Sequence, residues 1–204
     1  MMRFNKNLSF LGFVLLVTSS CTTPNIMYQP DYVPYSSFIA KSSQIDGKVV
    51  VVMSEAQENY IITKNPSSFS GSALSGTFNI GKMLKEITLS SYAVMFKDGS
   101  EFSNTYMDNY MVSITPTVTY FDYKFDQKKG LGFTVTPQVA IKLNLEMIDE
   151  NGNKSFSKEY SSGIVSGKSY AVSGQPFEEI NKVLHKVIFD VVEMTKIDLL
   201  REIN

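Results

Sequence analysis

The chain has 204 residues, of which 43% are hydrophobic, and its 19 basic and 20 acidic side chains give a formal net charge of −1. This balance excludes the strongly basic surface that nonspecific binding to nucleic acid requires. With one cysteine and one histidine, the chain can form neither an internal disulfide nor a metal site built from several histidines.

The first twenty residues have the features of an export signal. Arg3 and Lys6 precede an apolar run of ten residues from Leu8 to Val17, and small residues at 18–20 lead to Cys21. A run of ten is too short to cross a hydrocarbon core of ~30 Å, which takes about 20 helical residues. A basic start, a short apolar stretch and a small-residue exit are typical of a secretory signal.

Residues 18–21 resemble the lipobox of bacterial lipoproteins, in which the signal is cut before a cysteine that is then acylated. These boxes usually carry Leu three residues before the cysteine, and Thr18 stands there. The alternative is a secreted protein that is cut beside a cysteine by chance, which would leave one unpaired thiol in an oxidising compartment. We therefore expect lipid on Cys21, attachment to a membrane through that lipid, no other cofactor, and a net charge of −3 after cleavage.

Two units are expected after the signal peptide at 1–20. Residues 21–46 hold the lipidated cysteine and a tether rich in Pro, Ser and Tyr, and residues 47–204 suffice for a single α+β domain in the periplasm. The 23 residues at 22–44 would average roughly 25 Å as a coil. The tether has more aromatic side chains than a solvated linker needs, so we expect it to dock partly on the domain or on a partner. These side chains are Tyr28, Tyr32, Tyr35 and Phe38.

The strongest pattern is the alternation of apolar residues in the middle of the chain. From Leu131 to Met147 every odd residue is bulky and apolar and no even residue is. A period of two over this length predicts a long strand with one covered face. Residues 112–125 alternate as well, but the apolar parity changes at Tyr120 and Phe121, which predicts a β-bulge. Residues 126–130 would join the two strands as a hairpin with a charged tip.

Shorter patterns predict the remaining elements. The valines at 49–52 predict a strand buried on both faces, and Phe156, Tyr160 and Ile164 predict a third hairpin strand.

Helical spacing predicts one helix that begins after Asn79 and ends near residues 90–91, and a long one that begins at Pro176. The predicted fold class is α+β, in the order β-α-β-β-β-α, with a mostly antiparallel sheet, long hairpin strands and the helices packed on one face.

The sequence offers little catalytic chemistry. His185 is expected to lie exposed on the last helix, opposite its apolar stripe. Residues 163–169 resemble a phosphate loop, but they are one residue short between the glycines and no helix follows directly. Residues 65–76 lack the nucleophile elbow of serine hydrolases and are expected to form a flexible crossover. We therefore expect no enzymatic activity, no catalytic residue and no metal.

Short motifs near the C-terminal third give the chain a family resemblance. The Asn151-Gly-Asn-Lys154 turn, Lys158, Tyr160 and the long final helix are similar to YajG-like bacterial lipoproteins, and the layout is broadly similar to auxiliary outer-membrane lipoproteins of transport and secretion machines. The resemblance implies a β-α-β-β-β-α domain with no established activity. Enteric lipoproteins kept at the inner membrane carry Asp after the lipidated cysteine, and Thr22 stands here, which implies the outer membrane.

Two functions are expected to compete. The first is a non-enzymatic component that binds or assembles with envelope proteins, or with further copies of itself, at the periplasmic face of the outer membrane. The second is a carrier or accessory subunit for a small ligand or lipid in a transport or secretion system.

The long hairpin is expected to project beyond the final helix. A strand of ~17 residues reaches about 55 Å, whereas the final helix reaches about 40 Å, so we expect the end of the hairpin to form an interface. The expected interface residues are Tyr120, Phe121, Tyr123, Phe125, Lys128, Lys129, Leu131 and Phe133.

Overall fold

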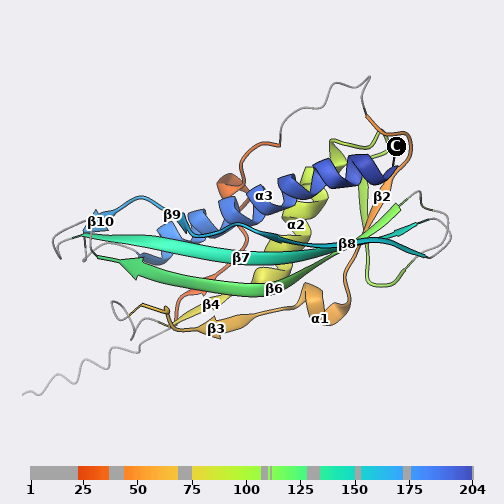
Figure 1. Ribbon diagram of the computed structural model, residues 1–204. Coiled ribbons are helices and arrows are strands. Elements are labelled where there is room, and N and C mark those ends of the chain that lie inside the picture. The colour runs from red at the N-terminus through yellow and green to blue at the C-terminus, as the bar shows by residue number, and fades with distance from the viewer. Residues whose placement is uncertain are drawn as a thin grey trace, which may run out of the picture.

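A long antiparallel hairpin organises the computed structural model (Figure 1). The structure describes residues 23–36, 44–68, 75–106, 110, 112–127, 134–149, 153–171 and 176–203. Strands β6 (Val112–Asp126) and β7 (Thr134–Asp149) pair from Val112 opposite Asp149 to Asp126 opposite Thr136, and the register shifts between Val118 and Tyr120. The predicted hairpin and the predicted bulge are both confirmed.

The described strands extend this hairpin into a seven-stranded sheet. Strands β8 (Lys154–Ser161), β9 (Val165–Ser166) and β10 (Tyr170–Ala171) pair antiparallel with β7. On the other side of β6, strand β2 (Val49–Val52) is parallel both to β6 and to β5 (Ser100–Ser103). The sheet is therefore mixed with an antiparallel majority.

Ile164 is not part of the third strand. It follows Gly163, which has a φ of 62°, and its side chain is 61% exposed. The left-handed glycine turns the chain out of the ladder before Ile164 is reached.

Helices α2 (Ile80–Ala93) and α3 (Pro176–Ile203) complete the predicted α+β layout. Buried residues of both helices share one core with the inward residues of the sheet. Helical spacing in the sequence predicts an apolar stripe on α3 formed by Ile180, Val183, Leu184, Val187, Val191, Met194 and Ile197. This stripe is correct as far as Val191, but Met194 and Ile197 are 47% and 59% exposed. The buried face instead continues through Thr195, Lys196 and Leu199, which follow Val191 at helical spacing.

The third strand is bonded to the last helix through Asp198. Both Nζ of Lys158 and the hydroxyl of Tyr160 donate to Oδ2 of Asp198, at 2.6 and 2.7 Å. Two residues of the YajG-like resemblance therefore connect β8 to α3. Burial and the nearby carboxylate raise the pKa of the Tyr160 phenol, so it acts as a neutral donor.

A second, small sheet was not predicted from the sequence. It consists of β1 (Asn25–Ile26), β4 (Gly76–Phe78) and β3 (Ile62–Lys64) in that spatial order. Strands β3 and β4 pair antiparallel, so the connection between them is a hairpin loop rather than the expected crossover. Two short helices, η1 (Pro30–Tyr32) and α1 (Glu55–Glu58), lie between β1 and β3 in the chain.

Candidate functional site

The aromatic side chains expected at the hairpin interface are mostly in the core. Phe121, Tyr123 and Phe125 are 5%, 0% and 4% exposed, whereas Tyr120, at 46%, faces outward. Phe78 of β4 covers them, with its ring centroid 4.8 Å from that of Phe121 and 4.9 Å from that of Tyr123. The expectation was wrong for these three because the small sheet covers this half of the hairpin. Lys128, Lys129, Leu131, Phe133 and Cys21 lie outside the described residues.

His185 is fully buried, so its predicted exposure is also wrong. Its Nε2 accepts the backbone N–H of Gln29 at 2.8 Å, and Nδ1 lies 2.8 Å from the carbonyl oxygen of Asn181. Because Nε2 accepts, the proton of the neutral ring must be on Nδ1, which donates to Asn181. The rings of Tyr28 and Tyr32 flank the imidazole at centroid distances of 5.6 and 5.7 Å.

The residues that cover His185 belong to the segment that was expected to be a tether. We call residues 25–36 the N-terminal strap. At its start Ile26 is 3% exposed and pairs with Phe78 in the small sheet. At its end the hydroxyl of Ser36 donates to Glu193 at 3.0 Å and accepts from Lys196 at 2.6 Å.

The anchors hold the strap along about four turns of α3. Asn181 donates to the carbonyl of Met27 at 3.2 Å, and Lys196 forms an ion pair with Glu193 at 2.5 Å. From Asn181 to Lys196 the helix rises about 22 Å. Lys196 is 6% exposed, and burial lowers the pKa of its ammonium group against the opposing effect of Glu193. Both partners of this ion pair are on α3, and Ser36 of the strap bonds to each of them, so an undocked strap would remove one hydrogen-bond partner from Lys196 and one from Glu193.

A groove of about 530 Å³ lies between the strap and the two long helices, and we call it the strap groove. Its walls are mainly apolar, with two serine hydroxyls among them. The lining residues are Tyr28, Pro30, Val33, Pro34, Tyr35, Ser36, Ser90, Val94 and Phe189. Its volume is within the range of about 300–1,000 Å³ that small-molecule sites occupy.

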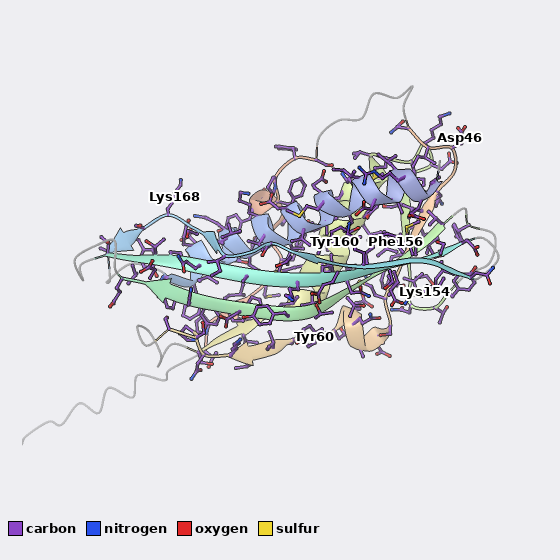
Figure 2. All side chains as sticks on the ribbon, viewed as in Figure 1. Asp46, Tyr60, Lys154, Phe156, Tyr160 and Lys168 are labelled. Atoms are coloured by element: carbon purple, nitrogen blue, oxygen red, sulfur yellow. The ribbon has the colours of Figure 1, made fainter. Side chains whose placement is uncertain are left out.

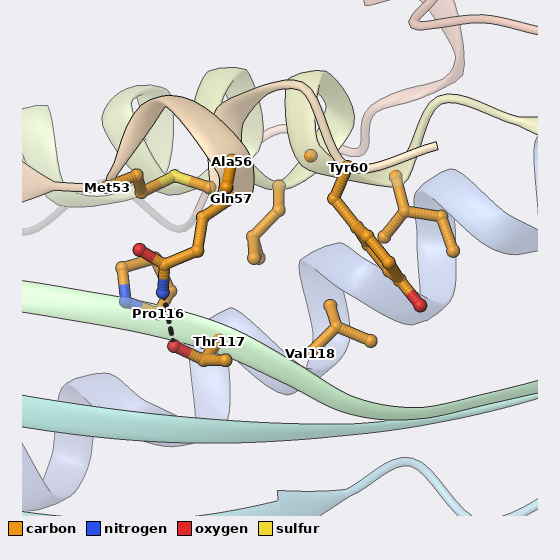
Figure 3. A pocket seen from close by; sticks show the side chains of 10 residues that line it. Met53, Ala56, Gln57, Tyr60, Pro116, Thr117 and Val118 are labelled. Carbon is orange, nitrogen blue, oxygen red and sulfur yellow. Dashed lines mark hydrogen bonds between the residues drawn. The ribbon is translucent and has the colours of Figure 1, made fainter. Parts of the chain in front are cut away.

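A smaller pocket of about 170 Å³ lies between α1, the start of α2 and the middle of β6 (Figure 3). We call it the α1 pocket. It exists because β2 ends at Val52 while β6 continues, so that a helical turn rather than a strand adjoins β6. The side-chain amide of Gln57 donates to the hydroxyl of Thr117 at 2.7 Å across one side. The lining residues are Met53, Ala56, Gln57, Tyr60, Ile80, Gly81, Leu84, Pro116, Thr117 and Val118.

Helix α1 can approach α2 this closely only because residue 81 is glycine. A Cβ at Gly81 would lie 2.2 Å from the carbonyl oxygen of Gln57 and 2.4 Å from that of Glu58. The backbone N–H of Gly81 donates to the carbonyl of Tyr60 at 3.0 Å. A capping box between Ser54 and Gln57 starts the helical turn itself.

One bulky side chain of the α1 pocket is partly exposed. Tyr60 lines the pocket and is 40% exposed, and Ile61, the next residue in the chain, is 54% exposed. Figure 3 shows the ring of Tyr60 beside Val118. The pocket volume is below the range of small-molecule sites and suits a single bulky side chain. The arrangement therefore favours recognition of part of a protein over binding of a metabolite.

Within the described ranges, no group of three His, Cys, Asp or Glu residues is placed to hold a metal ion. None of the helices in the described part of the chain has the length and apolar character needed to span a bilayer.

Acidification should loosen the strap. Burial lowers the pKa of His185 below its ordinary value of 6.5, outweighing the opposing bond to Asn181. The docked state therefore favours the neutral ring and loses stability as the pH falls below about 6.5, where the undocked histidine takes up a proton. Protonation also removes the acceptor of the Gln29 N–H. Hydrogen exchange at the Gln29 amide, corrected for its intrinsic pH dependence, should show less protection at about pH 5 than at about pH 7.5.

A His185→Gln variant is the control for this effect. Its side chain can still accept a hydrogen bond but does not titrate, so the pH dependence of the protection should disappear. Equal protection of the parent protein at both pH values would contradict the role of His185 in holding the strap.

Neither a protein-family model nor a curated protein matches the sequence. Among solved structures, a Xanthomonas campestris protein of the DUF330 family is similar, with a TM-score of 0.56 and 11% identity over 89% of this chain and 98% of that chain. A minor lipoprotein from Acinetobacter baumannii has a TM-score of 0.37 and 11% identity, with 75% and 91% of the two chains covered. A putative lipoprotein from Caulobacter crescentus has a TM-score of 0.36 and 13% identity, with 61% and 83% covered.

The first of these similarities shows a shared α+β fold. The other two TM-scores are too low to carry a structural argument. The first similarity establishes the fold alone. The function of the protein therefore has to be argued from the surfaces of this chain.

Proposed function

We propose that this chain is a lipid-anchored lipoprotein of the bacterial cell envelope that binds a protein partner and catalyses no reaction. Cys21 is the acylation site, and the domain faces the periplasm from the outer membrane, in the manner of YajG-like lipoproteins. The support is the export signal, the single cysteine after small residues and Thr22 in the following position. Two or more acyl chains on one cysteine give lasting attachment, whereas a single chain binds only marginally.

The α1 pocket is the observation that carries the binding role. Among the described strands, none pairs with residues 115–120 on the side of β6 that faces away from β7. The pocket lies beside this stretch, and the half-exposed ring of Tyr60 lines it. An extended segment of a partner can lie along such an edge and place one bulky side chain in the pocket. Aromatic residues around a pocket are typical of interface hot spots.

Photocrosslinking from the pocket rim in intact envelopes tests this role. A benzophenone amino acid at Tyr60 should capture one discrete envelope protein, or a second copy of the chain. An Ala56→Trp change, which fills the pocket from its exposed rim, should abolish that product. The matched control is Ala171→Trp, which adds the same side chain at an exposed position away from the pocket and should leave the product intact. A product that persists in Ala56→Trp, or no product at all, would contradict a partner at this pocket.

The alternative function is that of a carrier for a small ligand or lipid, and the strap groove favours it because its volume suits such a ligand. Native mass spectrometry of protein extracted gently from membranes separates the two functions. A co-purifying small molecule that is lost on a Val94→Trp change in the groove supports a carrier. A crosslinked protein at Tyr60 with an empty groove supports the partner.

A further inference from the structure

The lipidated cysteine and the folded domain are separated by a very short linker. The backbone N–H of Thr77 donates to the carbonyl of Pro24 at 2.9 Å, and Asn25 pairs with Thr77 in the small sheet. Only Thr22 and Thr23 stand between Cys21 and this first fixed residue. Three residue steps span at most about 11 Å when fully extended.

The strap would have to leave the domain before the linker could lengthen. Ile26 would come out of the core, Gln29 would leave His185, and Ser36 would leave the buried Lys196. These buried contacts therefore keep the strap on the domain. They disfavour the free coil of residues 22–44, which would give a tether of roughly 25 Å.

The chain enters the domain at one end of its long axis. Strand β1 runs parallel to β4, so the chain before Asn25 leaves past Gly76, the first residue of β4. Gly76 pairs with Lys64, the last residue of β3, and a Cβ at Gly76 would lie 2.8 Å from the ring of Phe177 in the first turn of α3.

The free end of the long hairpin lies at this same end. Ser67, just beyond β3, donates from its backbone N–H to Tyr123, near the end of β6, at 2.9 Å. Strand β10 pairs with the first residues of β7, Thr134 and Val135. We call the group of β1, β10, the end of β6 and the starts of β4, β7 and α3 the entry end. Figure 1 shows the C-terminus at the opposite end, and Figure 2 places Lys168 at the entry end and Lys154 far from it.

We propose that the entry end rests on the headgroups of a phospholipid bilayer and that the domain stands on it along the axis of the long hairpin. This inference rests on the proposed lipid anchor at Cys21. At ~3.3 Å per residue, the 16 residues of β7 place Asp149 about 50 Å from the bilayer. Val118 in the α1 pocket lies eight residues from the end of β6, which places it about 26 Å from the surface of the bilayer. The pocket is therefore beyond the reach of bilayer lipid and open to a protein partner.

Fluorescence quenching in vesicles tests this orientation. The acylated protein is placed in phosphatidylethanolamine–phosphatidylglycerol vesicles that contain a headgroup-linked quencher. Cys21 is the only cysteine and acylation blocks it, so an introduced thiol can be labelled uniquely. Lys168→Cys reports on the entry end, and Ser155→Cys on the opposite end, since both positions are exposed. The label at residue 168 should lose most of its fluorescence and the label at 155 should lose almost none.

A variant with ten Gly and Ser residues inserted between Thr23 and Pro24 tests whether the short linker causes this orientation. A longer linker lets the domain leave the surface, so quenching at residue 168 should fall towards that at 155. Unchanged quenching would overturn the role of the short linker, and equal quenching of both labels without the insertion would overturn the orientation. The mass of the preparation reports the acyl group separately. Its absence would overturn the anchor itself, whereas acylated protein with equal quenching would overturn only the inference drawn here.

Discussion

Replacing Phe125 by serine should destabilise the fold by about 3–5 kcal/mol, the usual cost of deleting a buried aromatic side chain. Phe125 is 4% exposed and its ring packs against that of Tyr123 at a centroid distance of 6.0 Å. The change leaves a cavity beneath the small sheet and places a hydroxyl in an apolar site. Equilibrium unfolding in urea measures the loss.

Tyr120→Ser is the matched control for this change. It removes an aromatic ring from the same strand, but from the outward face, where 46% of the residue is exposed. Surface changes of this kind usually shift the free energy of unfolding by no more than about 0.5 kcal/mol. A similar loss for both variants would mean that the small sheet does not cover the hairpin.

Replacing Gly81 by alanine should destabilise the protein by about 3 kcal/mol and displace α1. In an ordinary helix this change is stabilising, by about 1 kcal/mol, because alanine is the better helix former. Here the new Cβ would lie 2.2 Å from a backbone oxygen of Gln57, which cannot rotate away as a side chain would. The sign of the effect therefore reverses, and the α1 pocket should open with it. The unfolding midpoint and the Tyr60 crosslink both report on the change.

Lys82→Ala is the control for Gly81→Ala. It lies one residue further along α2 with an exposed side chain, so alanine should be neutral or slightly stabilising there. A stabilised Gly81→Ala variant would contradict the close contact between α1 and α2.

The elements that the sequence predicts well depend on residues that are close together in the chain. Alternation over the two hairpin strands, the parity change at Tyr120 and Phe121 and the spacing of α3 all lie within single segments. Each pattern is long enough to separate a period of 2 from one of 3.6. The bulge, the hairpin and the start of the last helix at Pro176 follow from such patterns, and the structure agrees with them.

The small sheet and the strap could not be predicted in this way. Strands of two or three residues are too short to show a period. The partners of β1 and of His185 are also remote in sequence, since Asn25 pairs with Thr77 and His185 binds Gln29. Because neither the small sheet nor the strap is predicted from the sequence, the part of the hairpin around Phe121 to Phe125 and the face of α3 that carries His185 were expected to be exposed. The aromatic residues of the strap were the one available signal, because a solvated linker does not need them.

The same distinction between local and long-range contacts applies to the candidate site. The capping box of α1 is visible in the sequence as Ser54 followed three residues later by Gln57. The α1 pocket, however, depends on where β2 ends relative to β6 and on the close approach at Gly81. Both depend on tertiary contacts between separate segments, which the intrinsic secondary-structure propensities of the residues do not predict.

The intact mass of the protein extracted from membranes with detergent tests the lipid anchor at Cys21 most directly. The proposal predicts a chain that begins at Cys21 and is heavier than its sequence by the mass of a diacylglyceryl group, with or without a further acyl chain. A Cys21→Ala variant should remain uncut or unacylated and lose its attachment. A mature chain that begins at another residue, or that carries Cys21 as a free thiol, would contradict the proposal.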